Sequence, residues 1–212
     1  MKIVAVSDTH EKEQFLKIPE CDLFIHAGDW TFRGEKYAVE KFGKWLNQIP
    51  AQHIVVIPGN HELYFENALP QSKDWLIDVC PKVNLLIEES IEINGVNIYG
   101  SPITPFFYAW AWNRYRYEIK PHWDNIPENT DILITHGGPY SILDQTIYGQ
   151  SVGCEYLYDR IKHIKPDLHI FGHIHAAKGE KHFDGTSYYN VSSCDEQYIL
   201  SQGYTVIDYE KN

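Results

Sequence analysis

The segment LHIFGHIHAAKG (residues 168–179) ends a short apolar run with a glycine and then two histidines one residue apart. Alternate residues of an extended segment point to the same side, so His173 and His175 can direct their imidazoles toward one small volume. Neutral imidazole is the commonest metal ligand. Because the chain contains 11 histidines, this pair indicates a metal site only if other strand ends supply further ligands.

Four more apolar runs end in the same way. In open α/β sheets, ligands gather at the carboxyl ends of the strands, so we expect the side chains that follow these runs to converge in one crevice. The runs and the residues that follow them are 3–6 with Asp8 and His10, 23–25 with Asp29, 54–57 with Asn60 and His61, and 132–134 with His136.

The pattern of apolar residues predicts the fold class. Continuous apolar strands are typical of sheets covered on both faces, and residues 35–49 and 155–164 carry apolar residues at helical spacing. Residues 90–101 alternate around Asn94-Gly95, which predicts a hairpin, and residues 186–193 and 203–209 contain two more strands. We therefore expect an α/β protein with two packed mixed β-sheets flanked by helices, in a single domain spanning residues 1–212.

Composition limits the partners. The formal net charge of −11 argues against binding to duplex DNA or to an anionic membrane. The N-terminus lacks a signal-peptide pattern and no apolar run is long enough to span a bilayer, so we expect no membrane association and a cytoplasmic location. The four cysteines show no CxxC spacing, which favours reduced thiols. The oligomeric state stays open.

The chemistry of the candidate ligands indicates the class of metal. Carboxylate and amide oxygens with imidazole nitrogens, and without any thiolate, suit Mn²⁺, Fe, Zn²⁺ or Co²⁺ better than Ca²⁺. The candidates number about twice the four ligands of a single closed site, as a pair of metals ~3.5–4 Å apart requires.

These motifs, in this order, resemble the five motifs of the calcineurin-like metallophosphoesterase superfamily. The motifs are Asp8-x-His10, Gly28-Asp29, Gly59-Asn60-His61-Glu62, His136 and Gly172-His173-x-His175. Other stretches, among them YGSPITPFFYAWAWN (residues 99–113) and DILITHGGP (residues 131–139), are similar to the small metallophosphoesterase-domain-containing family, whose members include cyclic nucleotide phosphodiesterases.

The resemblance implies an αββα metallophosphoesterase sandwich with two divalent metal ions, Mn²⁺ first and Fe, Zn, Co, Ni or Mg as alternatives. It assigns one metal to Asp8, His10, Asp29 and His175, and the other to Asp29, Asn60, His136 and His173. Asp29 would bridge the two ions, and Gly172 is expected to allow the bend that divides the two histidines between them.

The implied activity is hydrolysis of a small phosphoester substrate. We expect a metal-dependent phosphodiesterase acting on cyclic nucleotides or on aryl or nucleotide diesters, in which metal-bound hydroxide attacks phosphorus. His61, Asp29 and Asn60 are the expected catalytic residues. His61 would protonate the leaving oxygen or stabilise charge in the transition state. The alternatives are a phosphomonoesterase acting on a nucleotide or a phosphoprotein, a nuclease on short single strands, and a non-catalytic scaffold.

Two further features have more than one interpretation. Residues 106–117 combine seven aromatic residues with Asn113, Arg114 and Arg116; the segment either covers the core or stacks on a base and brings Asn113 and Arg114 to the substrate. Glu62 either orients His61 or a ligand, or begins a helix.

Overall fold

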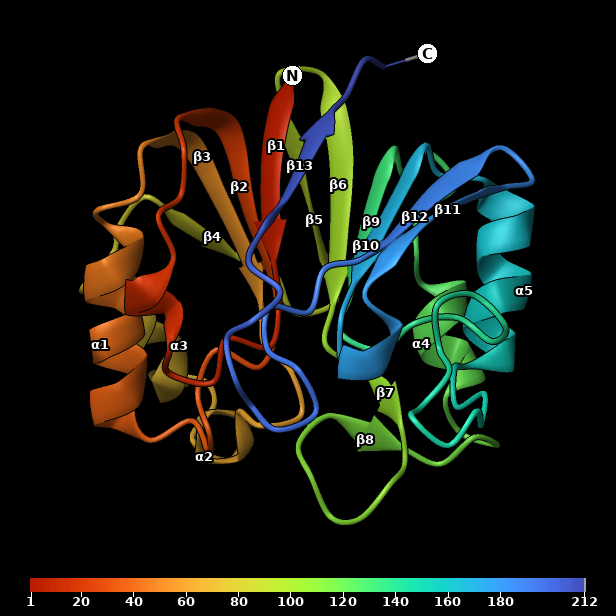
Figure 1. The fold of residues 1–212 in the computed structure, drawn as a ribbon, viewed down its shortest axis with the longest axis horizontal. Coiled ribbons are helices and arrows are strands. Elements are labelled where there is room, and N and C mark those ends of the chain that lie inside the picture. Colours follow the sequence, from red (N-terminus) through yellow and green to blue (C-terminus); the bar gives the residue numbers. More distant parts are fainter. Residues whose placement is uncertain (212) are drawn as a thin grey trace.

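Two mixed β-sheets pack face to face, with helices on their outer sides (Figure 1). The computed structural model describes residues 1–211. The first sheet has the order β13-β1-β2-β3-β4, and only β13 runs antiparallel to its neighbour. Its strands are β1 (Lys2–Val6), β2 (Cys21–Ala27), β3 (Ala51–Ile57), β4 (Val83–Leu85) and β13 (Thr205–Asp208).

The second sheet has the order β11-β12-β10-β9-β6-β5, with antiparallel pairing at both edges and parallel pairing between. Its strands are β5 (Glu89–Ile93), β6 (Val96–Ser101), β9 (Ile132–Thr135), β10 (Leu168–Phe171), β11 (Gly179–Phe183) and β12 (Thr186–Asn190). A separate pair of short parallel strands joins β7 (Thr104–Pro105) to β8 (Asn113–Arg114).

Helices complete the outer layers. In Figure 1, α1 and α3 cover the outer face of the first sheet, and α4 and α5 cover that of the second. The helices are α1 (Lys36–Leu46), α2 (Leu63–Asn67), α3 (Gln71–Ile77), α4 (Lys120–Asp124) and α5 (Glu155–Ile164), with short 3-10 helices η1 (Glu13–Phe15) and η2 (His175–Ala177). The predicted α/β class, with two mixed sheets flanked by helices, is confirmed.

Alternation along the strands explains the layers. In β1, Ile3 and Ala5 point between the sheets, where they belong to the same core as Ile132 and Ile134 of β9. Val4 and Val6, on the other face of β1, belong to the core beneath the helices, together with residues of α1 such as Phe42. Both faces of the strand are therefore buried, which is why its sequence is continuously apolar.

The predicted hairpin joins β5 to β6. Asn94 and Gly95 both have positive φ, 52° and 79°, as a two-residue type I′ turn requires. Ile93 pairs with Val96 across it.

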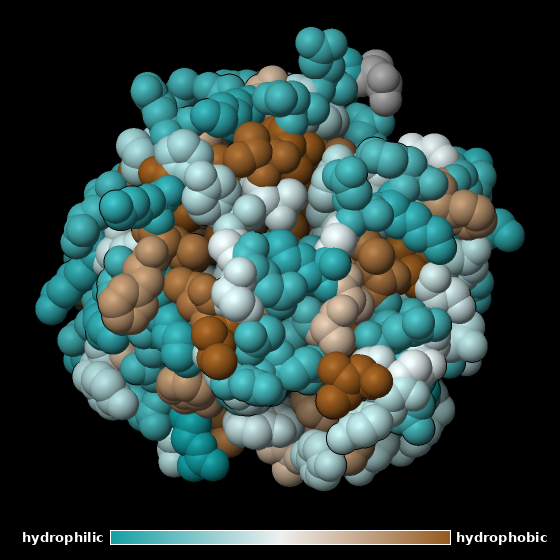
Figure 2. All heavy atoms as spheres, viewed as in Figure 1, coloured by the Kyte–Doolittle hydropathy of each residue, from teal (hydrophilic) through white to brown (hydrophobic). Residues whose placement is uncertain are grey.

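The carboxyl ends of β1, β2, β3, β9 and β10 lie along one edge of the packed sheets, at the bottom of Figure 1, with both termini on the opposite side. A bridge between Ser7 and Ser192 links the two sheets at this edge. The face seen in Figure 2 is largely hydrophilic, and its hydrophobic residues lie in separate small groups. Within residues 1–211, no helix is long and apolar enough to cross a membrane.

Candidate metal centre and active site

The polar residues that follow the strands meet between the two sheets. The first sheet contributes Asp8, His10, Asp29 and Asn60, and the second contributes His136, His173 and His175. Several of them have a left-handed backbone, with φ of 54° at Asp8, 45° at His10, 56° at Asp29 and 70° at His173. Residues other than glycine adopt this conformation at a cost of about 1 kcal/mol or more each, so the surrounding structure must stabilise these turns.

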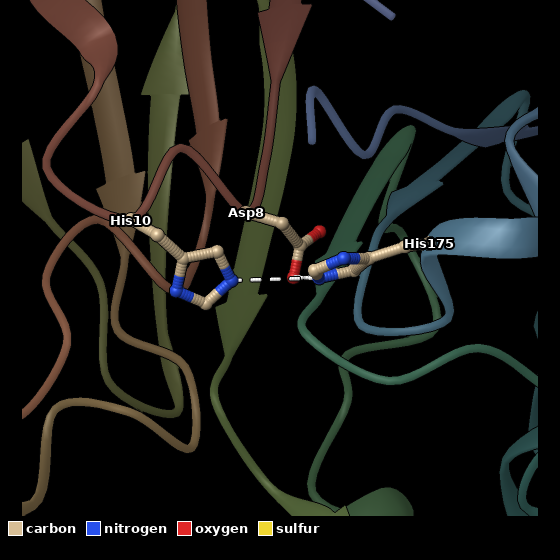
Figure 3. A group of neighbouring side chains, drawn as sticks. All are labelled: Asp8, His10 and His175. Atoms are coloured by element: carbon tan, nitrogen blue, oxygen red, sulfur yellow. Dashed lines mark hydrogen bonds and ion pairs between the residues drawn. The ribbon is translucent and has the colours of Figure 1, made fainter. Parts of the chain in front are cut away.

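Asp8, His10 and His175 form one group of side chains that point toward one another (Figure 3). The Nε2 atoms of His10 and His175 face each other at 3.4 Å, and Nε2 of His175 lies 3.4 Å from Oδ1 of Asp8. All three side chains are buried. Two imidazole nitrogens and a carboxylate oxygen that face one buried point are a donor set that fits a divalent cation.

Asp29, His136 and His173 form a second group. Nε2 of His136 lies 3.3 Å from Oδ2 of Asp29 and 2.9 Å from Oδ1 of Asn60, so Asn60 joins this group. Oδ2 of Asp29 is also 4.0 Å from Nε2 of His10. Asp29 therefore lies between the two groups, where one carboxylate can serve both.

The turn around His173 differs from the extended segment expected from the sequence. Strand β10 ends at Phe171, His173 adopts φ 70°, and His175 begins η2. The backbone amide of His173 donates to the carboxylate of Asp8 at 3.0 Å, which fixes the turn. The two histidines consequently reach different groups, His175 the first and His173 the second.

Gly172 contributes space, and the left-handed bend lies at His173. A Cβ atom at position 172 would collide with the side chains of Ser7 and Asp8. Only glycine allows β10 to approach the end of β1 this closely. Gly172 was expected to place the two histidines by allowing a bend of the backbone. It does so instead by allowing close packing.

Backbone carbonyls orient two of the imidazoles. Nδ1 of His175 donates to the carbonyl of Asp195 at 2.8 Å, and Nδ1 of His136 donates to the carbonyl of Ala27 at 2.9 Å. A carbonyl accepts only, so each Nδ1 carries the proton and each Nε2 is directed into the site.

Glu62 anchors the loops that carry Asp29 and Asn60. Its buried carboxylate accepts hydrogen bonds from the amides of Gly59 (2.6 Å), Asp29 (3.0 Å) and Thr31 (2.9 Å), and from the Thr31 hydroxyl (2.9 Å). Burial, with the negative charge of Asp29, raises the pKa of Glu62 to about 8. Glu62 also precedes α2, but its side chain makes no capping hydrogen bond there, so the structure supports the orienting interpretation.

The electrostatics of the two groups favour bound positive charge. Burial opposes ionisation of Asp8, yet the adjacent His175 holds the pKa of that carboxyl well below its usual value; Asp29 beside His136 likewise has a lowered pKa. Despite burial, these carboxylates raise the pKa of both His136 and His175 to about 9. A divalent cation that bound here would displace the proton from Nε2 of each of these two histidines.

Burial lowers the pKa of the other two histidines more than the nearby carboxylates raise it, and neighbouring imidazoles add to the lowering. As a result, the pKa of His10 is lowered to about 4 and that of His173 to about 3. Both imidazoles are therefore neutral near pH 7, which is the form that binds metals.

His61 is half-buried at the edge of the centre. Its Nδ1 donates to the carbonyl of Phe32 at 2.9 Å, and its backbone amide donates to Oδ1 of Asp29 at 2.8 Å. A ring nitrogen of His61 also lies within 4.8 Å of ligand atoms of His10 and Asp29. The geometry thus allows His61 to act beside the metals or as a ligand.

A cavity of about 550 Å³ opens onto Asp29, Asn60, His61, His173 and His175. Its other lining residues include five aromatic ones, Phe106, Phe107, Tyr108, Trp110 and Tyr198. Both interpretations of the segment 106–117 therefore find support, because four of its aromatic residues line the cavity and Trp112 is buried in the core.

Asn113 and Arg114 are not among the described residues that line this cavity. Asn113 accepts from Thr104 Oγ1 at 2.9 Å and donates to the carbonyl of Phe107 at 2.9 Å, which shapes the loop. Arg116 reaches the cavity instead, and its guanidinium donates to the carbonyls of Val152 and Gly153 and to the carboxylate of Glu155. A substrate contact by Asn113 or Arg114 stays a prediction.

The segment after β12 contributes residues that the sequence analysis missed. Ser192 donates to Oδ2 of Asp8 at 2.8 Å, the carbonyl of Asp195 orients His175, and the ring of Tyr198 lies 4.7 Å from that of His10. The sequence contained a signal for this segment, because polar residues follow β12 as they follow the other strands that carry candidate ligands.

Comparisons with known proteins agree with this arrangement. Residues 1–177 match the calcineurin-like phosphoesterase family profile. The chain is 35% identical to human metallophosphoesterase domain-containing protein 1, over 98% of this chain and 70% of that protein.

Solved structures share the fold at low sequence identity. One crystal structure aligns over 99% of both chains with a TM-score of 0.73 and 14% identity. Phosphopantetheinyl hydrolase from Mycobacterium tuberculosis aligns over 97% of this chain and 95% of its own, with a TM-score of 0.66 and 15% identity.

Proposed function

Because this chain belongs to the calcineurin-like phosphoesterase family, we propose that it hydrolyses small phosphodiesters with two divalent metal ions, with His61 as general acid. The observation that carries the proposal is the position of Asp29 between two groups of buried imidazoles and carboxylates at the floor of one cavity. The ligand atoms are nitrogen and oxygen, which suits Mn²⁺ first and Fe, Zn²⁺, Co²⁺, Ni²⁺ or Mg²⁺ as alternatives.

Asp8, His10, Asp29 and His175 would hold one ion, and Asp29, Asn60, His136 and His173 the other. A pair of divalent ions supplies Lewis acidity toward a phosphoester and lowers the pKa of bound water. The chain supplies the orientation: Glu62 fixes the backbone at Asp29 and Gly59, and backbone carbonyls fix the tautomers of His136 and His175.

His61 is the proposed proton donor to the leaving oxygen. It lines the cavity, and the carbonyl that accepts from its Nδ1 leaves the opposite nitrogen for the substrate. A protonated imidazole at this position can deliver a proton as the P–O bond breaks.

The cavity walls support a diester with a flat, uncharged substituent. Arg116 is the only lysine or arginine among the described lining residues, and Glu155 already neutralises its charge. Glu196 adds a carboxyl group to the lining. A monoanionic diester with an aryl or nucleobase group therefore fits better than a substrate with a second charged phosphate.

A substrate panel at fixed Mn²⁺ tests the proposal. It comprises an aryl phosphodiester, cyclic nucleotides, a mononucleotide, a phosphopeptide and a short single-stranded oligonucleotide, each with the wild type and the Asp29→Asn variant. We expect the small diesters to be hydrolysed fastest, with activity that Asp29→Asn removes. Faster hydrolysis of a monoester or the oligonucleotide would refute the diesterase assignment. If the metal-loaded protein hydrolyses none of the substrates, a non-catalytic scaffold is favoured.

A further inference from the structure

Trp110 packs on the face of His61. The two ring centroids lie 4.4 Å apart with an interplanar angle of 26°, a stacked arrangement. Both residues line the cavity. Nothing in the proposed chemistry requires a tryptophan, so the question is what the stack contributes to the site.

The backbone around Trp110 is tied to the segment that carries His61. The amide of Ala111 donates to the carbonyl of Asn60 at 3.1 Å, and the amide of Trp112 donates to the carboxylate of Glu66 in α2 at 3.1 Å. The first bond holds the loop between β7 and β8 against the loop after β3, and the second holds it against α2. Trp110 is therefore a fixed wall for His61, although it belongs to a distant part of the sequence.

The stack supplies a restraint that hydrogen bonding does not. The bond from Nδ1 to the carbonyl of Phe32 fixes one edge of the imidazole, but the ring can still swing about that contact. The ring of His10 meets His61 edge-on at 4.7 Å, and the indole covers one face of the imidazole. Together, the contacts with Phe32, His10 and Trp110 hold Nε2 of His61 in one orientation toward the cavity.

We propose that Trp110 is a positioning residue that acts through His61, holding the imidazole in the orientation from which it serves the leaving group. The inference rests on the proposed function, since it assumes that His61 takes part in phosphoester hydrolysis. Orientation of a catalytic group contributes to the rate only as far as the group would otherwise rotate away, so an effect of about tenfold is expected.

The first test requires no turnover. The imidazole signal of His61 in an NMR spectrum of the full chain is assigned by its loss in His61→Gln. A proton above an indole face is shifted upfield, so Trp110→Leu should move the signal downfield and broaden it, and Trp110→Phe should restore part of the shift. A signal unchanged by Trp110→Leu would overturn the proposal.

The second test measures kcat and KM on Mn²⁺-loaded enzyme with a nitrophenolate and an alkoxide leaving group. Trp110→Leu should lower kcat for the alkoxide substrate about tenfold, leave KM within about twofold and change the nitrophenolate rate little. Trp110→Phe should recover most of the loss. Tyr108→Leu is the matched control, because Tyr108 belongs to the same loop and cavity and makes its ring contact with Phe107; it should alter KM without changing the dependence on leaving group.

A double variant separates this inference from the proposed function. If Trp110 acts through His61, Trp110→Leu adds no further loss of kcat in the His61→Gln background. Fully additive losses would overturn the positioning role. If His61 is not the general acid, the single variant His61→Gln slows hydrolysis of both substrates equally. Non-additive losses of kcat in the double variant still support the positioning role of Trp110.

Discussion

Nδ1 of His136 donates a hydrogen bond to the backbone carbonyl of Ala27 at 2.9 Å, which joins the end of β9 in one sheet to the end of β2 in the other. The bond fixes the tautomer of His136, so that its Nε2 faces Asp29 and Asn60. Asp29 follows Ala27 by only two residues. The ligand and the group that orients it are therefore positioned by the same turn.

The metal content is the first expected outcome. Because two groups of ligand atoms share Asp29, the Mn²⁺-reconstituted protein should contain about two metal ions per chain. Elemental analysis with protein quantification measures this. Saturation at one ion, without a second site on titration, would rule out the binuclear arrangement.

Asp29→Asn should lose metal and activity together. The substitution removes a buried negative charge that both groups of imidazoles face, and an amide cannot replace a bridging carboxylate. Metal content and hydrolysis of an aryl diester are measured on the same preparation, with Asp124→Asn as the control, because the Asp124 side chain is exposed on α4. Full metal occupancy in Asp29→Asn would contradict the bridging role.

His61→Gln should keep its metals and lose turnover. Glutamine retains a polar side chain but cannot deliver a proton near neutral pH, so kcat should fall by ~10²–10⁴-fold for a poor leaving group and less for a nitrophenolate. Metal analysis accompanies the kinetics. Loss of one metal would instead assign His61 as a ligand, which its position near His10 and Asp29 also allows.

Gly172→Ala should damage the centre through packing. The new methyl group would collide with Ser7 and Asp8, so we expect a destabilisation of about 1–3 kcal/mol and weaker metal binding. Gly179→Ala is the matched control, because its Cβ would meet Leu143 at an ordinary contact distance of 3.6 Å. Thermal unfolding and metal titration of both variants measure the difference, and equal behaviour would refute the packing argument.

Glu13 should make the free energy of unfolding depend on pH. Burial raises the pKa of Glu13 from an ordinary 4.5 to about 7, and Oε2 has no hydrogen-bond partner among the described residues. The unfolded chain releases this proton at lower pH than the folded chain, so folding stability falls as pH rises from about 4.5 to 7 and then levels off.

Glu13→Gln should remove the loss of folding stability that the wild type shows as pH rises. The variant should be more stable than the wild type at pH 8, by at most about 3 kcal/mol, and the difference should nearly vanish at pH 4.5. Denaturant unfolding at the two pH values measures it. A difference that is the same at both pH values would show that Glu13 does not titrate in this window.

The order of motifs along the chain was sufficient to predict the layers and the candidate ligands. Apolar strands that end in Asp8, Asp29, Asn60, His136 and His173 reveal both the buried sheets and their common edge, because strand polarity determines where such residues meet. The hairpin at Asn94-Gly95 was predictable for a local reason, since its two residues tolerate positive φ. The single-domain assignment stays a prediction.

What the sequence could not provide depends on contacts between distant segments. The stack of Trp110 on His61 and the bonds from Glu62 to Asp29 and Thr31 require knowledge of how loops pack. The turn at His173 is likewise fixed by a carboxylate 165 residues away. No local pattern distinguishes Arg116, which reaches the cavity, from Arg114, which does not.

The division of the ligands between two sheets has a consequence for how the protein tolerates substitution. Each group contains ligands from both sheets, and the core that contains Ile3, Ile25, Ile134 and Ile170 separates those sheets. A change of volume in this core should therefore alter the distances within each group of ligands as well as the free energy of unfolding. A substitution of equal size in the core beneath the helices, for example at Val39 of α1, should change the free energy of unfolding alone. Substitutions in the inter-sheet core should therefore weaken metal binding as well as stability.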